Sequence, residues 1–286
     1  MADNASADAT DSLVRERFPE VDFVQIGYNS GFSRANNAAI LRSQGRYLFL
    51  LNPDTRVTNG CIDTLTAFMD ANPDVAAAGP RLLNRDLSLQ YSIRNLPTLR
   101  GSLLEAVFLH HAFPRLLARY GEMVFDEAAY ETPHPVGWVS GAAMFIRRSA
   151  LERVGLLDES FFLFSEEIDW FKRMHDLGLP VWFVPDAAVV HRHDKQGHNP
   201  DLIAIDVDSR RRYWRKHASR SRAALALAVL ALGMSLRCLL WSLLALSGNK
   251  DAMRESAAFG RGLWALTPNG RPKRPRPPSD DPAAPR

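Results

Sequence analysis

The sequence feature that most constrains the fold is an apolar run that ends in Asn-Pro-Asp. Residues Tyr47–Leu51 are five consecutive large apolar side chains, followed by Asn52, Pro53 and Asp54. Such a run is typical of a strand buried in a parallel sheet, and proline ends the strand because it has no N–H to donate. In open α/β sheets, ligands bind at the carboxyl ends of the strands. A divalent ion shared with a ligand's phosphates needs only one or two protein carboxylates there. A turn residue that caps the next helix is an equally good interpretation of Asp54.

The rest of the chain alternates strand-like and helix-like segments. Helices are predicted over residues 12–18, 34–43, 59–70, 101–120 and 166–177, with a helical turn over 150–154, and strands over 21–26, 75–80, 137–146 and 181–184. No strand is expected before residue 12, and residues 81–98 are expected to form a loop over the site. The alternation predicts an α/β fold with a mixed, mostly parallel sheet flanked by helices. With 286 residues, 46% of them hydrophobic, the chain can bury one sizeable core.

Three acids stand directly after a second apolar run. Glu166, Glu167 and Asp169 follow the apolar residues 161–164 and open a predicted helix. Acids at a helix start are usually surface charges that the helix dipole favours. Burial against the apolar run would instead raise the proton affinity of at least one of them, which suits a general base. His191 follows the apolar residues 187–190 and is a second candidate for a site.

The C-terminal third changes in character. Residues 209–222 are rich in arginine and contain no acid, and residues 223–247 are apolar all round, with Arg237 as the one charge. A basic segment beside a long apolar one indicates contact with a membrane. A span, an interfacial hairpin and a helix packed on the catalytic domain remain open alternatives, because insertion of Arg237 costs about as much as the leucines offset. Residues 267–286 are rich in proline and arginine and are expected to be disordered.

Two further observations restrict the setting and the partners. Cys61 and Cys238 lie far apart without metal or redox spacing, which fits a reducing, cytoplasmic compartment. Nucleic acid is not expected as a partner, because no nucleic-acid-binding motif accompanies the basic segments.

Taken together, five motifs over residues 3–195 resemble the family 2 glycosyltransferases of the GT-A fold, and most closely the rhamnosyltransferase-like branch. Residues 3–8 are similar to the family's D-N-x-S-x-D turn, and residues 29–37 to its N-x-G-F-x-x-A-N-N segment. Asn52-Pro53-Asp54 stands where the family has its D-x-D metal motif. The resemblance implies a nucleotide-diphosphate sugar donor. It assigns donor contacts to Asp3, Ser6, Asp8, Asn29, Gly31, Asn36, Asn52, Asp54 and Arg94.

The same resemblance assigns the catalytic and acceptor residues. Residues 165–169 are similar to the family's E-D-x-D motif, whose second acid is the catalytic base, here Glu167. It also implies a divalent ion, Mg²⁺ or Mn²⁺, held by Asp54 and His191. The residues that the resemblance places at the acceptor are Trp138, Gly141, Ala142, Glu166 and Asp169.

The chain also departs from the family pattern, because it starts at the D-N-x-S-x-D turn. The family has a strand, a helix and a strand before that turn, and loss of roughly forty residues there would expose two sheet edges. We expect the reading frame to extend upstream of Met1. The predicted organisation is a GT-A domain over residues 1–208, a membrane-associated helical region over 209–266 and a tail over 267–286.

The expected function is inverting transfer of a sugar, L-rhamnose from dTDP-L-rhamnose, to a lipid-linked or polysaccharide acceptor. The expected location is the cytoplasmic face of the inner membrane. The alternative is an inactive, truncated relative that binds a membrane or a partner protein.

Overall fold

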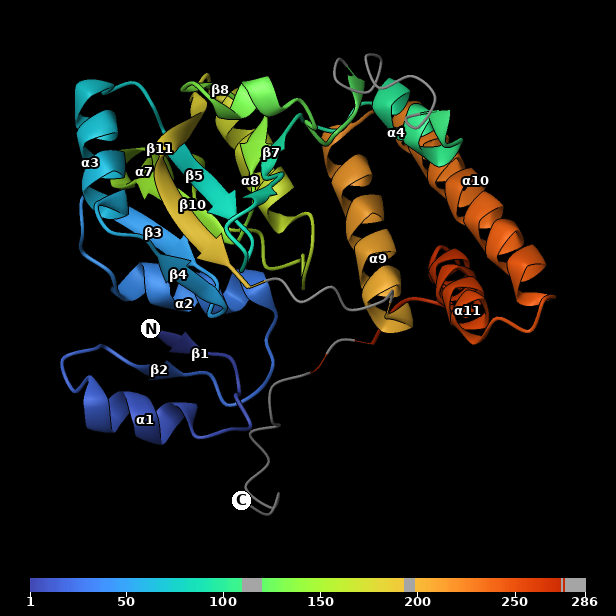
Figure 1. Ribbon diagram of the computed structural model, residues 1–286, viewed down its shortest axis with the longest axis horizontal. Helices are drawn as coiled ribbons and strands as arrows, with labels where there is room; N and C mark the ends of the chain where they lie inside the picture. Colours follow the sequence, from blue (N-terminus) through green and yellow to red (C-terminus); the bar gives the residue numbers. More distant parts are fainter. Residues whose placement is uncertain (110–119, 193–198, 274, 276–286) are drawn as a thin grey trace.

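A seven-stranded mixed sheet forms the centre of the molecule (Figure 1). The computed structural model describes residues 1–109, 120–192, 199–273 and 275. Five strands lie in the order β3-β10-β5-β11-β4, with β6 beside β5 and β8 beside β11. Their bounds are β3 Tyr47–Leu51, β4 Thr55–Val57, β5 Ala77–Leu83, β6 Leu89–Gln90, β8 His134–Pro135, β10 Ala143–Arg147 and β11 Val181–His191.

The mixed sheet predicted from the sequence is confirmed, but the expected parallel majority is wrong. Among the described pairings of this sheet, β5 with β11 is parallel, while β10 runs antiparallel to both β3 and β5. Strands β4 and β8 run antiparallel to β11, and β6 antiparallel to β5. Because β10 lies between β3 and β5, these two strands share a direction without being neighbours. The carboxyl ends of β3, β5 and β11 therefore point the same way.

Two smaller strand pairs flank the large sheet. β1 (Ala2–Asp3) and β2 (Val24–Gln25) form a parallel pair, and β7 (Ile93–Arg94) and β9 (Trp138–Val139) form an antiparallel pair. β1 contradicts the expectation that no strand precedes residue 12. β6 and β7 likewise show that residues 81–98, predicted as loop, contain short strands. Strands of two residues carry too little periodicity to be seen in a sequence.

Helices cover both faces of the large sheet. The helices are α1 Thr10–Arg17, α2 Phe32–Arg42, α3 Cys61–Ala71, α4 Leu99–Ala106, α7 Arg148–Val154, α8 Glu166–Asp176, α9 Pro200–His217, α10 Arg220–Ala245 and α11 Lys250–Ala265, with a 3₁₀ turn over Glu127–Tyr130. Side chains of α2, α7, α8 and α9 share one core cluster with one face of the strands. α3 packs on the other face. The alternation of strand side chains thus fills two cores.

α9, α10 and α11 form a helical group beside the sheet, and α4 packs on α10 (Figure 1). Within the described residues one helix, α10, is long and apolar enough to cross a membrane. In the structure one face of α10 is buried through Ala223, Ala226, Val229 and Gly233. Arg237 donates to the backbone oxygen of Glu105 at 3.0 Å, close to the C-terminal end of α4. A helix end favours a cation there, which explains how α10 accommodates a charge.

Several strands and helices begin or end at residues other than those predicted. β11 continues through Pro185 to His191, because a register shift between Val184 and Ala188 places the proline in an irregularity, where it disrupts no ladder hydrogen bond. The strand predicted over 137–146 breaks at residues 140–142 into β9 and β10, which belong to different sheets. α9 runs without a break across the predicted boundary at residue 208. Residues 110–119 of the predicted helix over 101–120, and most of the predicted tail, lie outside the described residues.

Candidate active site

Asp54 and His191 lie together at one edge of the large sheet. β3 ends at Leu51, and the backbone N–H of Asn52 donates to Ala142 O at 3.0 Å. β4 then pairs with the end of β11, with Thr55 opposite His191. This pairing brings Nε2 of His191 to 3.3 Å from Oδ2 of Asp54. The strand end that the sequence indicated therefore does lead to a cluster of polar groups.

A chain of side-chain amides sets the tautomer of His191. Nδ1 of His191 lies 2.8 Å from Oε1 of Gln90, and Nε2 of Gln90 donates to Oδ1 of Asn84 at 3.1 Å. Gln90 therefore accepts from Nδ1–H, so the Nε2 of a neutral imidazole presents its lone pair to the Asp54 carboxylate. An imidazole and a carboxylate that face each other are suitable ligands for a cation, as in metal sites whose histidine is held from behind.

The donor set fits a divalent ion that also binds a ligand. Among the described residues no group of three or more His, Cys, Asp or Glu side chains converges. One carboxylate and one imidazole leave most coordination positions to water and phosphate oxygens, which is how Mg²⁺ is commonly held. Asp54 is 44% exposed, so a ligand reaches it from solvent.

The predicted donor residues near the N-terminus lie on two loops that are tied together. The side chain of Asn4 accepts from the N–H and hydroxyl of Ser30, both at 2.8 Å, and donates to Asn29 Oδ1 at 3.1 Å. Asp3 is buried, and its Oδ1 accepts from the N–H of Ser6 at 3.1 Å. Asn4 stands inside the predicted motif, yet its position as the link between the two loops was not expected.

Asp8 differs from the other predicted donor residues. Its Oδ1 accepts from both the N–H and the hydroxyl of Thr10, at 3.0 and 2.5 Å. These hydrogen bonds, led by the one from the hydroxyl, lower the pKa of Asp8. Ser6 and Asp8 are both exposed. The contacts of Asp8 are those of a residue that orders the start of α1, so donor binding by Asp8 stays a prediction.

Gly31 fixes the start of α2 against the loop that leads into α8. Its φ of 86° is in the left-handed region, and a Cβ added there would lie 2.4 Å from Phe162 O. The next residue, Phe32, donates its N–H to Phe162 O at 2.7 Å. Only glycine meets both requirements. The side-chain amide of Asn36 donates back to Phe32 O at 3.0 Å, which leaves its oxygen for other contacts.

Glu167 lies in the first turn of α8 and faces the loop before β10. A Cβ placed on Gly141 would lie 3.6 Å from Oε1 of Glu167 and 3.6 Å from the ring of Phe32. Burial raises the pKa of Glu167 to about 7, against a backbone hydrogen bond and the charge of Arg94, which lower it. The side chain has no hydrogen-bond partner for its buried Oε2 within the described residues. A carboxylate that titrates near neutrality is suited to proton transfer.

Glu166 is buried more deeply than its neighbour. Burial, and then the charge of Glu167, raise the pKa of Glu166 well above its ordinary value. The prediction that burial raises the proton affinity of at least one of these acids is therefore confirmed.

A layer of charged side chains lies behind Glu167, and of these the sequence indicated Arg94 alone, as a donor contact that stays a prediction. Arg94 lies over the ring of Trp138 at 5.2 Å, and Glu122 accepts from Nη1 of Arg210 at 3.1 Å. Arg210 also pairs with Asp206, one turn earlier on α9, at 3.1 Å. The charges of Arg94, Glu122 and Asp206 all act on the pKa of Glu167. The charged residues come from three distant segments, and no local pattern connects them.

Three of the predicted acceptor residues are buried in the structure. Asp169 is fully buried, and its carboxylate accepts from Arg173 at 2.9 Å, Lys216 at 2.7 Å and His217 at 2.7 Å. Trp138 is buried, and its indole donates to Asn95 O at 3.0 Å. Ala142 is buried as well. Asp169 thus joins α8 to α9. Contact of these three residues with an acceptor stays a prediction.

Comparisons with known proteins show which family the chain belongs to. The family described as "Glycosyl transferase family 2" matches residues 1–155. The N-acetylglucosaminyl-diphospho-decaprenol L-rhamnosyltransferase of Mycobacterium tuberculosis (strain ATCC 25618 / H37Rv) is 31% identical over 202 residues, which are 67% of this chain and 65% of that protein. The dTDP-rhamnosyl transferase RfbF of Shigella flexneri is 25% identical over 200 residues, which are 68% of this chain and 60% of that protein. The chain thus spans less than two thirds of the length of either relative.

A solved structure shares the fold. The mannosyltransferase PcManGT of Pyrobaculum calidifontis, solved in complex with GDP-Man and Mn²⁺, gives a TM-score of 0.50 at 17% identity and covers 92% of this chain and 76% of that chain. The family match extends over more than half of the sequence, and the rhamnosyltransferases are its relatives. The chain therefore belongs to glycosyl transferase family 2, in the rhamnosyltransferase-like branch, and has the GT-A fold.

Proposed function

We propose that the protein is an inverting glycosyltransferase that moves L-rhamnose from dTDP-L-rhamnose to a lipid-linked or polysaccharide acceptor in cell-envelope glycan synthesis. The observation that carries the proposal is Glu167. It is a partly buried carboxylate with a pKa of about 7 that faces Gly141. Gly141 is followed by Ala142, whose carbonyl oxygen accepts from Asn52 at the end of β3. Glu167 and Asp54 therefore lie on neighbouring segments. The first would act as the base for the acceptor, and the second would bind the donor diphosphate.

In this mechanism Glu167 removes the proton from the acceptor hydroxyl. The oxygen attacks the anomeric carbon from the side opposite to the leaving diphosphate, so the configuration at that carbon inverts. Arg94 lowers the pKa of Glu167 and so keeps part of it ionised near neutrality. Glu166 is buried more deeply than Glu167, and burial holds its pKa well above the ordinary value. When bound, Mg²⁺ or Mn²⁺ held by Asp54 and His191 would neutralise the leaving diphosphate.

Donor and acceptor assignments rest on the relatives and on the loops around the site. One relative is named for a dTDP-rhamnosyl donor reaction and another for an acceptor with a diphosphate and a decaprenol chain. The loops of Asp3 and Asn29 are expected to hold the nucleotide, and Gly141 is expected to lie against the acceptor. Asn36 and Asn52 stay predicted donor contacts.

Membrane association is part of the same proposal. The face of α10 away from the core exposes leucines along its length: Leu225, Leu232, Leu239, Leu243 and Leu246. A continuous apolar face of this kind marks a membrane or protein interface. A lipid-linked acceptor would be reached by an enzyme held at the cytoplasmic face of the membrane through this surface.

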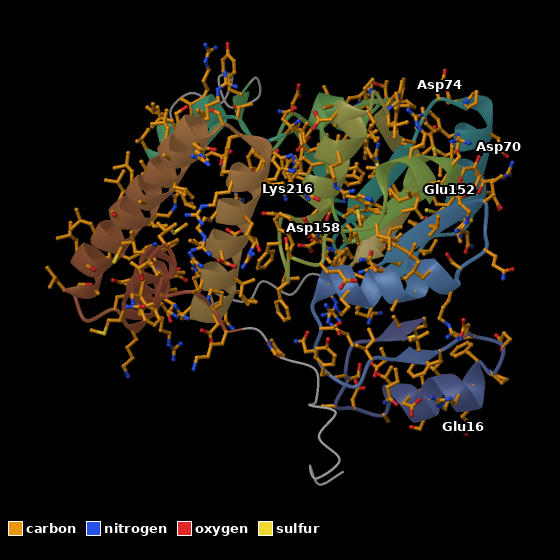
Figure 2. All side chains as sticks on the ribbon, turned by 180° about the vertical axis from the view of Figure 1, so that it is seen from behind. Glu16, Asp70, Asp74, Glu152, Asp158 and Lys216 are labelled. Atoms are coloured by element: carbon orange, nitrogen blue, oxygen red, sulfur yellow. The ribbon has the colours of Figure 1, made fainter. Side chains whose placement is uncertain are left out.

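The proposal is tested by transfer of radiolabelled rhamnose from dTDP-L-rhamnose to N-acetylglucosaminyl-diphospho-decaprenol. Loss of a general base typically costs 10²–10⁴-fold in rate, so Glu167→Gln is expected to lose about that factor while it still binds dTDP. The matched control is Glu152→Gln, an exposed residue labelled in Figure 2 on α7, which follows the end of β10 opposite to the site. This variant should transfer at the unchanged rate. If the protein without substitutions binds dTDP but transfers no sugar, the result would instead support the alternative that it is an inactive relative.

A further inference from the structure

A basic hollow lies where α9 meets the loop that leads into α8. It has a volume of about 350 Å³ and is bordered by Ser160 and Phe161 of that loop. The cations that line it are Arg211, Arg212, Arg215, Lys216 and Arg271. Figure 2 shows Lys216 beside Asp158 at this junction, and Nζ of Lys216 lies 2.6 Å from Oδ2 of Asp158. None of these lining residues is among those assigned above to the donor, the metal or the base.

The acids around the hollow do not balance its cations. Asp208 pairs with both Arg211 and Arg212, and Lys216 pairs with Asp158 and Asp169. Among the described residues, five cations line the hollow, and the three acids that pair with them include Asp169, which Arg173 also contacts, so positive charge is in excess. Arg215 and Arg271 are both exposed, and within the described part of the chain neither forms an ion pair with an acid.

Such an excess in a concave site favours an anion. Like charges gathered at low-dielectric walls repel one another, and they raise the local concentration of an anionic ligand. Guanidinium groups bind phosphate oxygens through paired N–H donors. A diphosphate that joins a sugar to a lipid is esterified at both ends and carries two negative charges, which suits a site lined by several cations. A single-phosphate lipid headgroup carries fewer.

The hollow shares a wall with the site of Glu167. The loop that contributes Ser160 and Phe161 continues directly to Glu167 on α8, and Ser209 of α9 donates to Leu163 O in this loop at 2.8 Å. On the other side, α10 begins at Arg220, four residues after Lys216, and Leu225 of its first turns is exposed. The hollow therefore borders the loop that leads to Glu167 and the end of α9 that leads to α10.

We propose that this hollow binds the diphosphate of a lipid-linked acceptor, with the sugar directed to Glu167 and the lipid to α10. The proposal rests on the proposed function for the identity of the ligand. The part of the proposal that concerns anion binding rests on the residues that line the hollow.

The anion site is tested first by calorimetric titration of the full chain with sodium diphosphate, in EDTA and at fixed ionic strength. EDTA removes divalent ions, so the donor site does not contribute metal-dependent binding. The test variant is Arg215→Gln combined with Arg271→Gln, and the control is Lys250→Gln combined with Arg254→Gln on α11, which removes the same charge from exposed positions. One charge-assisted contact is worth about tenfold or more in affinity. We expect at least that loss in the test variant and none in the control. An equal loss of diphosphate affinity in the test variant and the control would overturn the proposed anion site.

The acceptor assignment is tested by transfer kinetics on the same chains. The test variant should raise KM for N-acetylglucosaminyl-diphospho-decaprenol about tenfold or more, with kcat and KM for dTDP-L-rhamnose unchanged. Sedimentation with phosphatidylglycerol vesicles tests the other source of phosphate, which is a phospholipid headgroup. Weaker vesicle binding with an unchanged acceptor KM would overturn the assignment in favour of a phospholipid headgroup. If diphosphate binding depends on the hollow but no chain transfers sugar, the proposed function fails and the anion site stands.

Discussion

Nε2 of His191 lies 3.3 Å from Oδ2 of Asp54, and Gln90 holds the opposite ring nitrogen at 2.8 Å. The two facing atoms come from the ends of β11 and β3, which are more than a hundred residues apart in the chain. The sheet register brings them together, because Thr55 and His191 are paired residues of β4 and β11. The metal proposal thus depends on a strand pairing as much as on the Asn-Pro-Asp sequence.

Asp54→Ala is expected to abolish binding of dTDP that depends on Mn²⁺. The carboxylate is the one anionic ligand that the proposal assigns to the ion, and a neutral side chain cannot replace its charge. Asn52→Ala should weaken binding less, because an amide oxygen is a weaker ligand. Calorimetry with and without Mn²⁺ measures both effects. Asp74→Ala, an exposed change far from the site, serves as control, and unchanged metal-dependent binding in Asp54→Ala would remove Asp54 from the site.

Gln90→Leu tests the support behind the histidine. Gln90 accepts from Nδ1 and so orients Nε2 toward Asp54. Loss of such a partner typically costs 10–100-fold in metal affinity, and we expect about that loss in titrations with Mn²⁺ followed by electron paramagnetic resonance. The same affinity in Gln90→Leu would mean that His191 is not a ligand.

Activity should fall as the pH decreases through about 7, because Glu167 has to be ionised to accept a proton and its pKa lies at about 7. Folding stability should change in the opposite direction. The folded pKa is raised above the usual 4.5, so this carboxyl stabilises the folded state below pH 4.5, and that contribution is lost as the pH rises to 7. Glu167→Gln should therefore melt at a higher temperature than the unchanged chain at pH 8 and at a similar temperature at pH 4. Identical melting differences at both pH values would contradict the raised pKa.

The local part of this site was predictable from the sequence. The apolar run of β3 and the acids at the start of α8 carry their own signal, because burial and helix periodicity are properties of neighbouring residues. Asp54 and Glu167 are therefore found where the sequence indicates, at a strand end and in a first helical turn.

The remaining part depends on tertiary contacts. Arg210 reaches Glu122, which is 88 residues earlier in the chain, through the packing of α9, and no spacing rule predicts that contact. Pro185 ended the predicted strand because proline usually does so, yet a register shift lets β11 continue to His191. Asp169 matched a family motif at the acceptor, but only the position of α9 shows that its carboxylate is enclosed by Lys216 and His217.

Asp169→Asn is expected to destabilise the fold more than it affects chemistry. The fully buried carboxylate accepts from Arg173 on α8 and from Lys216 and His217 on α9. Burial alone would raise the pKa of Asp169, but hydrogen bonds from His217 and Lys216 hold this pKa below its usual value. An amide removes the charge that these donors require, which should cost at least about 1.5–3 kcal/mol, the value of one hydrogen bond to a charged group. Urea unfolding measures the loss, and Asp176→Asn on the same helix is the control, because its single ion pair with Lys172 is exposed.

The exposed leucines of α10 should determine membrane binding. Leu225, Leu232 and Leu239 are spaced by seven residues, so they share one face of the helix, and they are 55%, 42% and 58% exposed. Burial of a leucine is worth about 1.5–3 kcal/mol, so the triple change to glutamine should reduce the vesicle-bound fraction by at least about tenfold. Deletion of residues 209–250 is a poorer test, because Tyr213 of α9 belongs to the main core.

The control for this surface replaces three exposed leucines elsewhere with glutamine: Leu41, Leu87 and Leu177. Flotation with vesicles then compares proteins of equal composition that differ only in the position of the polar groups. The α10 variant should remain in the soluble fraction and the control should float, since only the first loses a continuous apolar face. Extraction with alkaline carbonate separates the two modes of attachment. An interfacial helix is released because its polar contacts hold it at the surface, whereas a span through the hydrocarbon layer is retained. Equal flotation of the two variants would show that this face of α10 does not contact the membrane.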